Sequence, residues 1–132
     1  MKSTWTKFVL ICTLFVVFTL PASALTKHNF NMNLPKSPAT TNYSPSYASS
    51  GLTGETPYVT TNVTTILTTY YLAPSGSSTK ATSATNLSTL GSGNMPWKTG
   101  YGGAGSYYRL AATPHPINGS WNAYTVSGVF RF

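Results

Sequence analysis

Acidic residues are almost absent from this chain of 132 residues, which contains Glu55 as its single acidic side chain. Glycosidases and aspartic proteases use paired carboxylates, and this sequence cannot supply a pair. The two histidines, His28 and His115, and the one Glu are too few for a zinc site built from three or four protein ligands. We therefore expect a protein that is not an enzyme and that holds neither a metal ion nor a cofactor.

Cysteine is nearly absent as well, because Cys12 is the only one. It lies within an uncharged apolar run, residues 8–20, which comes after the basic residues Lys2 and Lys7. The run is too short for a permanent membrane helix, and the small residues of the segment 22–24 form a cleavage site of the A-x-A kind. This arrangement predicts a helical signal peptide.

The signal peptide is predicted to span residues 1–24 and to leave residues 25–132 as a single secreted domain. Because Cys12 departs with it, the exported chain contains no disulfide, a pattern more typical of bacterial secreted proteins than of small animal ones. We expect an extracellular or cell-wall-associated protein with no stable membrane insertion after cleavage.

The predicted mature chain is basic because it lacks acids, not because its cations are clustered. Its six basic residues are Lys27, Lys36, Lys80, Lys98, Arg109 and Arg131. A nucleic-acid-binding surface is expected to group such residues on one face, and these are scattered singly along the sequence. The charge instead predicts a general attraction to polyanions, with no nucleic acid among the partners.

Strand patterns dominate the chain after the signal peptide. Residues 28–34 alternate Asn with apolar side chains, and residues 58–72 are rich in Val, Ile, Thr and Tyr without Gly or Pro. The second segment is long enough for one bent strand or for two strands that separate near Thr64 and Thr65. No stretch has the three-and-four spacing of an amphipathic helix. The predicted fold is all-β, a small antiparallel β-sandwich.

The remaining segments are assigned by their turn residues and by alternation. Residues 35–57 contain several Pro and Gly and predict a long surface connection with a short strand near Tyr47. Residues 80–90 predict a polar strand, and residues 91–106 a Gly-rich loop. The last two strands are predicted at residues 107–112 and 124–132.

The final segment predicts a strand of the core. Tyr124, Val126, Phe130 and Phe132 are expected to point inward, with Trp121 beside them. Its expected neighbour is the strand at residues 107–112, across a turn.

Several segments, taken in order, resemble a family of small secreted proteins of Gram-positive bacteria that is known only as a domain of unknown function. The similar segments are "FNMNL", "NYS", "PYVTTNVTT", "YYLA", "GSG" and, at the end, Trp121 followed by "YTVSG". The chain departs from the family after that glycine, where it has "VFRF" in place of tryptophan and acidic residues. The resemblance implies export and a compact β domain, and it implies no activity.

Aromatic side chains supply the only candidate for a ligand contact. Trp97 and Tyr101 lie in the Gly-rich loop with Lys98 between them, and we expect both rings to be exposed. Such rings can stack on sugars while their polar tips stay in water. We therefore expect a non-enzymatic extracellular protein that associates with an anionic cell-wall polymer or with a glycan.

A secreted antagonistic protein of the bacteriocin kind is the alternative. The predicted mature chain is short, cationic, free of cysteine, and rich in Gly and Tyr. Inhibition of related cells would distinguish this function from cell-wall association.

Overall fold

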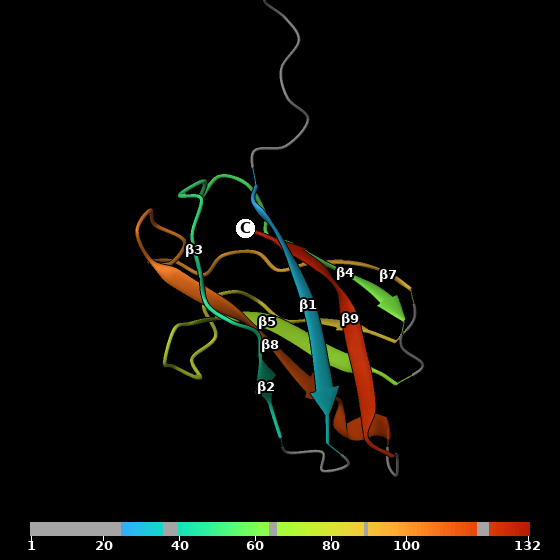
Figure 1. Cartoon of the computed structure of the whole chain (residues 1–132). Coiled ribbons are helices and arrows are strands. Elements are labelled where there is room, and N and C mark those ends of the chain that lie inside the picture. The colour runs from blue at the N-terminus through green and yellow to red at the C-terminus, as the bar shows by residue number, and fades with distance from the viewer. Residues whose placement is uncertain (1–24, 36–39, 64–65, 89, 119–121) are drawn as a thin grey trace, which may run out of the picture.

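The computed structural model describes residues 25–35, 40–63, 66–88, 90–118 and 122–132, and the predicted signal peptide lies outside them. Figure 1 shows strands arranged in two layers, as predicted. Within the described residues the only helical element is the 3-10 turn η1 (Pro116–Asn118), and no helix is long and apolar enough to cross a membrane. The all-β sandwich fold is confirmed.

The first sheet contains four antiparallel strands in the order β1-β9-β4-β7. Their bounds are Lys27–Leu34 for β1, Tyr124–Arg131 for β9, Tyr58–Val63 for β4 and Gly91–Asn94 for β7. Phe30, Met32 and Leu34 of β1 are buried, as their alternation with Asn predicts. The strand β7 lies within the segment that is predicted to be a Gly-rich loop. The sequence does not predict this strand, because GSGN has a composition typical of loops.

The second sheet is built around β8 and β5, in the order β2-β8-β5-β6, with β3 also paired to β8. Its bounds are Asn42–Tyr43 for β2, Tyr47–Ala48 for β3, Thr68–Pro74 for β5, Thr85–Leu87 for β6 and Tyr107–Pro114 for β8. The short strand predicted near Tyr47 is therefore present. The strand predicted at residues 80–90 is much shorter than expected.

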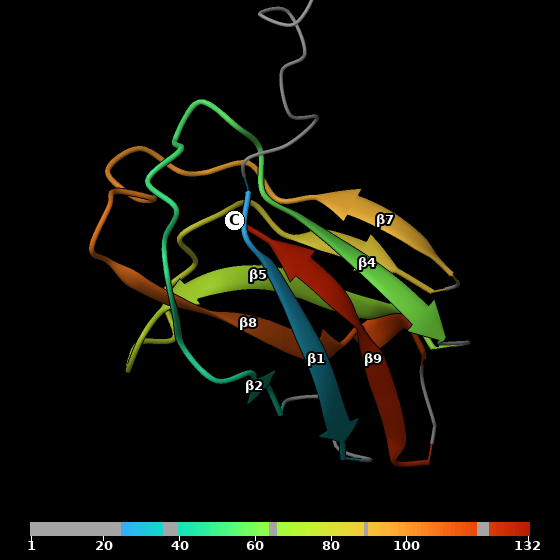
Figure 2. The same cartoon turned by 45° about the horizontal axis from the view of Figure 1, so that its top comes forward.

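Residues 58–72 form two strands, one of the two alternatives that their length allows. β4 belongs to the first sheet and β5 to the second, so the chain crosses between the layers there (Figure 2). The predicted break at Thr64 and Thr65 lies outside the described residues. The register between β4 and β9 also shifts between Thr61 and Val63, as at a β-bulge.

The terminal strand β9 lies inside the first sheet, between β1 and β4. This corrects the expected pairing with residues 107–112, because those residues form part of β8 in the other sheet. Val126, Phe130 and Phe132 are buried as predicted, whereas Tyr124 is half-buried. Trp121 lies outside the described residues. The segment therefore forms a core strand, and Phe132 at its end is completely buried.

The core is made of aromatic and aliphatic side chains from both sheets. The rings of Phe130 and Phe132 stack at 5.8 Å between centroids, and the ring of Tyr108 meets Phe132 edge-on from the second sheet at 6.0 Å. Gly128 lets β9 approach β4 closely, since a Cβ atom there would lie 2.0 Å from the carbonyl oxygen of Thr60. These contacts fix the two layers against each other and leave the second sheet with one face toward solvent.

Candidate functional site

A second cluster of side chains lies on the solvent side of the β2-β8-β5-β6 sheet. Strand alternation places these side chains opposite the core, and we call this surface the outer face. Tyr43 and Tyr71 pack on the small residues Ala73 and Ala111 there, apart from the main core. Both alanines are completely buried. The two tyrosine rings therefore form a fixed platform on the sheet.

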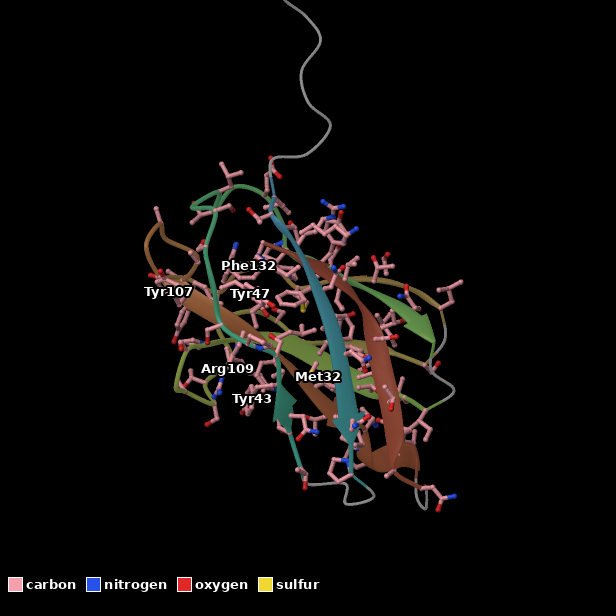
Figure 3. All side chains as sticks on the ribbon, in the orientation of Figure 1. Met32, Tyr43, Tyr47, Tyr107, Arg109 and Phe132 are labelled. Carbon is pink, nitrogen blue, oxygen red and sulfur yellow. The ribbon has the colours of Figure 1, made fainter. Side chains whose placement is uncertain are left out.

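Arg109 lies on the platform and points along it toward Tyr43 (Figure 3). Its guanidinium carbon is 3.7 Å from the ring centroid of Tyr43, and Nη2 donates a hydrogen bond of 2.9 Å to the carbonyl oxygen of Ser77. The Nε atom is buried and has no hydrogen-bond partner among the described residues. A cation on an aromatic ring is stabilised by the ring quadrupole and keeps its full charge.

Lys80 repeats this arrangement on the neighbouring ring. Its Nζ atom is 5.2 Å from the ring centroid of Tyr71, and the residue is exposed. The only acidic residue of the chain, Glu55, is exposed in the turn of residues 52–55, between β3 and β4. One carboxylate can neutralise at most one cation, so the outer face carries a net positive charge.

Hydroxyl groups form a row next to the tyrosines. Thr69 of β5 is opposite Thr113 of β8 in the register, and the hydroxyls of Thr41 and Thr113 are 2.6 Å apart. Thr69 donates a hydrogen bond of 2.7 Å to Oδ1 of Asn86 on β6. A cavity of about 270 Å³ lies against this row and is bordered by Lys80. The outer face therefore combines cations, rings and hydroxyls.

The Tyr71 hydroxyl is protonated at neutral pH. Burial raises its pKa, the neighbouring Tyr43 hydroxyl raises the pKa further, and a hydrogen bond with Thr41 and the charge of Arg109 oppose the shift. A neutral phenol can donate a hydrogen bond without adding negative charge beside the two cations. The outer face thus stays positive across the physiological pH range.

The loop that contains the predicted contact residues differs from the expectation. Trp97 is half-buried, and its ring packs on Tyr108 at 4.9 Å and on Phe132 at 6.3 Å between centroids. Gly102 covers the indole so closely that a Cβ atom would lie 2.8 Å from it. These contacts make Trp97 a packing residue at the margin of the core, while Lys98 is exposed beside it.

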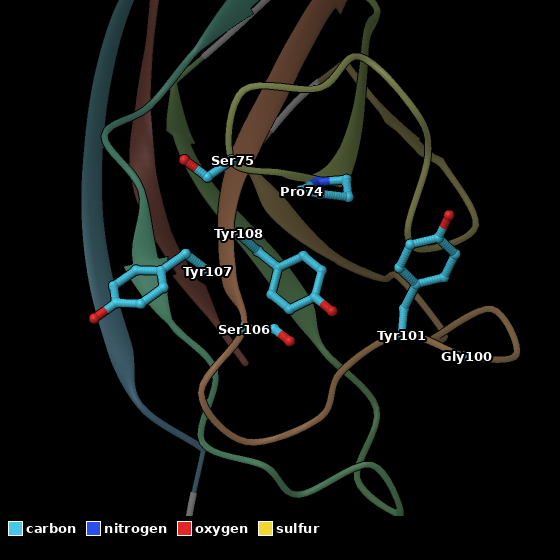
Figure 4. Close-up of a pocket in the computed structure, with 7 residues that line it drawn as sticks. All are labelled: Pro74, Ser75, Gly100, Tyr101, Ser106, Tyr107 and Tyr108. Atoms are coloured by element: carbon cyan, nitrogen blue, oxygen red, sulfur yellow. The ribbon is translucent and has the colours of Figure 1, made fainter.

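Tyr101 is also half-buried, and it borders a second, open cavity of about 420 Å³ (Figure 4). Its ring and that of Tyr108 lie on either side of this hollow, and Tyr107 also lines it. Tyr107 is the exposed ring of this region, with 56% of its surface accessible. The structure therefore brings Trp97 and Tyr101 together with the core aromatics.

Sequence reasoning does not identify the outer face, although its signal is present. In "YYRLAA", residues 107–112, alternation puts Tyr107, Arg109 and Ala111 on one side of the strand, and Tyr71 and Ala73 alternate likewise in "YYLA". A cation flanked by a tyrosine and an alanine on the solvent-facing side of a strand can become part of a surface of rings and cations once neighbouring strands pair with it. Tyr43 cannot be assigned to it from the sequence, because the pairing of β2 with β8 is not visible there.

Comparisons with known proteins identify no related protein whose function could be assigned to this site. No group of three or more His, Cys, Asp or Glu residues that could hold a metal ion occurs in the part of the chain that the structure describes. No family model matches the sequence, and searches of curated proteins and of solved structures find no similar protein. The resemblance to secreted Gram-positive proteins stays a prediction, and the site must be interpreted from its own chemistry.

Proposed function

We propose that this chain is a secreted, non-enzymatic bacterial protein that associates with an anionic polymer of the cell wall through its outer face. One observation carries the proposal: Arg109 and Lys80 lie on tyrosine rings, in a chain with a single acid. Cations that pair with carboxylates are neutralised, whereas these two keep a charge that an external anion can satisfy.

The geometry favours a surface contact over catalysis. The outer face has cations, neutral hydroxyls and rings, and its described residues lack the acid and base pair that hydrolysis of a polymer would use. A sheet face with fixed side chains can contact an extended polymer over more than one unit. Electrostatic attraction supplies the long-range component, while the tyrosine platform holds the cations in place.

The experiment uses the protein exported by a bacterial host and purified from the medium. It is mixed with isolated Gram-positive cell walls at low salt and at about 0.5 M NaCl, where exposed charges are screened within a few ångströms. We expect the protein to sediment with the walls at low salt and to stay in solution at high salt. A protein that stays in solution even at low salt would reject the proposal.

A growth assay separates the alternative. The same protein is added to cultures of related strains, where an antagonist of the bacteriocin kind would arrest growth and a wall-associated protein would not.

Walls stripped of their anionic polymers serve as the matched control for the sedimentation experiment, because they keep the neutral glycan. We expect the protein not to sediment with these walls at low salt.

A further inference from the structure

The cavity on the outer face has a floor of hydroxyl groups and a positive border, and this combination specifies a ligand more closely than charge alone. Its volume is about 270 Å³. The residues around it are Thr41, Thr69, Tyr71, Lys80, Thr113, Pro114 and Pro116. This volume lies just below that of pockets for drug-sized ligands, so it suits one small unit of a polymer.

The hydrogen bonds of the floor leave it richer in acceptors than in donors. The Thr69 hydroxyl donates its proton to Asn86, and one of the hydroxyls of Thr41 and Thr113 donates its proton to the other. Each hydroxyl oxygen has two lone pairs, so acceptor positions stay open after these bonds form. An acceptor-rich floor suits a ligand that brings its own hydroxyl protons, as sugars and sugar alcohols do.

The border of the cavity, in contrast to its acceptor-rich floor, offers hydrogen-bond donors and positive charge. Lys80 provides an ammonium group with three donors, and Arg109 adds a second positive charge on the same face of the sheet. A neutral ligand would not satisfy these charges. A ligand that fits floor and border together has to carry hydroxyl groups and an anionic group within one unit.

We infer that this cavity is a subsite for one anionic sugar or sugar-alcohol unit, with the hydroxyl groups of the unit on the threonine floor and its phosphate or carboxylate group beside Lys80. This inference rests on the proposed function, and it names the chemical class of the repeating unit at the same surface. It does not involve the loop that contains Trp97 and Tyr101.

Calorimetric titration of the exported protein with four small probes tests the subsite. Glucose 1-phosphate and glucuronate carry both features, glucose lacks the charge, and inorganic phosphate lacks the carbon-bound hydroxyls. We expect at least one of the anionic sugars to bind about tenfold more tightly than glucose and than phosphate, the gain expected from one or two net hydrogen bonds. The better of the two identifies the anionic group.

Variants assign the binding to the cavity. Thr69→Val and Thr113→Val remove hydroxyls at nearly constant shape and should abolish the tenfold preference over phosphate. Thr60→Val is the matched control, because Thr60 pairs with Ser92 at 2.6 Å on the other sheet, away from the cavity. This variant should keep the preference.

The outcomes separate the inference from the proposed function. If phosphate binds as tightly as both anionic sugars while the protein still sediments with walls, charge alone drives association and the subsite is rejected. Equal effects of Thr60→Val and Thr69→Val would also reject it. Loss of sedimentation with walls in the unaltered protein would instead reject the proposed function.

Discussion

The guanidinium carbon of Arg109 lies 3.7 Å from the ring centroid of Tyr43, and the two residues come from β8 and β2, which pair at the edge of the second sheet. This contact holds a positive charge on a solvent-facing surface. The partner of the charge is an aromatic ring and not a carboxylate, so the charge is not neutralised. Tyr43 also packs against the cluster that contains Ala111, which would otherwise expose apolar surface. The same pair of residues therefore covers apolar surface and holds a positive charge on the outer face.

Removing the ring should weaken this contact measurably. Tyr43→Ala should lower the free energy of unfolding by about 1 to 2 kcal/mol, because a partly desolvated cation on an aromatic ring contributes on this scale. Tyr43→Phe keeps the ring and should cost clearly less. Denaturant unfolding of both variants measures the difference, and equal losses would show that the ring does not hold the guanidinium.

We expect His28 to make the fold sensitive to mild acid. Its ring stacks on Tyr47 at 4.0 Å, its Nε2 atom is buried without a hydrogen-bond partner among the described residues, and burial lowers its pKa. The unfolded chain therefore binds a proton more readily than the folded chain. Stability should be complete above the ordinary histidine pKa of about 6.5 and should fall as the pH drops below it.

The measurement is the midpoint of thermal unfolding between pH 8 and pH 5. His28→Phe keeps an aromatic ring against Tyr47 and has no titrating group, so its midpoint should fall less than that of the unaltered protein over this range. If both proteins lose stability in parallel, His28 is not the source of the acid sensitivity.

Trp97 should prove to be a stability residue. Since its half-buried ring packs on Tyr108 and Phe132, Trp97→Ala should cost about 2 to 3 kcal/mol of unfolding free energy, less than the range for a fully buried aromatic residue. Lys98→Ala, next to it and exposed, should cost less than about 0.5 kcal/mol. A Trp97→Ala protein with unchanged stability would restore the indole as a candidate for stacking on a glycan.

Gly128 should be intolerant of even a methyl group. A Cβ atom there would approach the Thr60 carbonyl oxygen within 2.0 Å, so the two central strands would have to separate. Gly128→Ala should therefore destabilise the domain by more than about 2 kcal/mol, in the range of overpacked core sites. Gly54→Ala is the control, because nothing lies within 4 Å of its added Cβ.

The fold class is predictable because alternation records burial directly: Phe30, Met32 and Leu34 alternate with Asn and are buried. The order of the strands is not predictable from the sequence. The alternation of the Tyr124–Arg131 segment is compatible with several neighbouring strands, and long-range packing selects β1 and β4. The Gly-rich β7 has no strand signal of its own, because its conformation depends on pairing with β4 and not on its own propensity.

The candidate site is harder to predict for a related reason. The glycines around Trp97 suggest a solvent-exposed ring, but Gly102 allows the loop to fold over the indole. In the sequence, Arg109 is only one of several scattered cations. Its significance depends on a cross-strand neighbour, Tyr43, that is far away along the chain. Spacing in the sequence cannot reveal such a pair.

Association through the outer face requires that the position of the positive charge, and not its total, drives binding to an anionic polymer. Two double variants with the same loss of charge separate these causes: Lys80→Gln with Arg109→Gln on the outer face, and Lys27→Gln with Arg131→Gln on the other sheet. Lys27 is exposed and Arg131 is half-buried, and the two residues are opposite each other on β1 and β9 of the other sheet. Thermal unfolding verifies that each variant is folded, and Lys80→Gln alone serves if Arg109→Gln is unstable.

The decisive measurement is the sedimentation of these variants with isolated cell walls as NaCl rises from about 0.05 M to about 0.5 M. We expect the outer-face variant to lose most of its binding at low salt, while the control pair retains binding until salt screens it. Equal losses in the two variants would contradict association through the outer face, as would binding by the unaltered protein that persists at about 0.5 M NaCl.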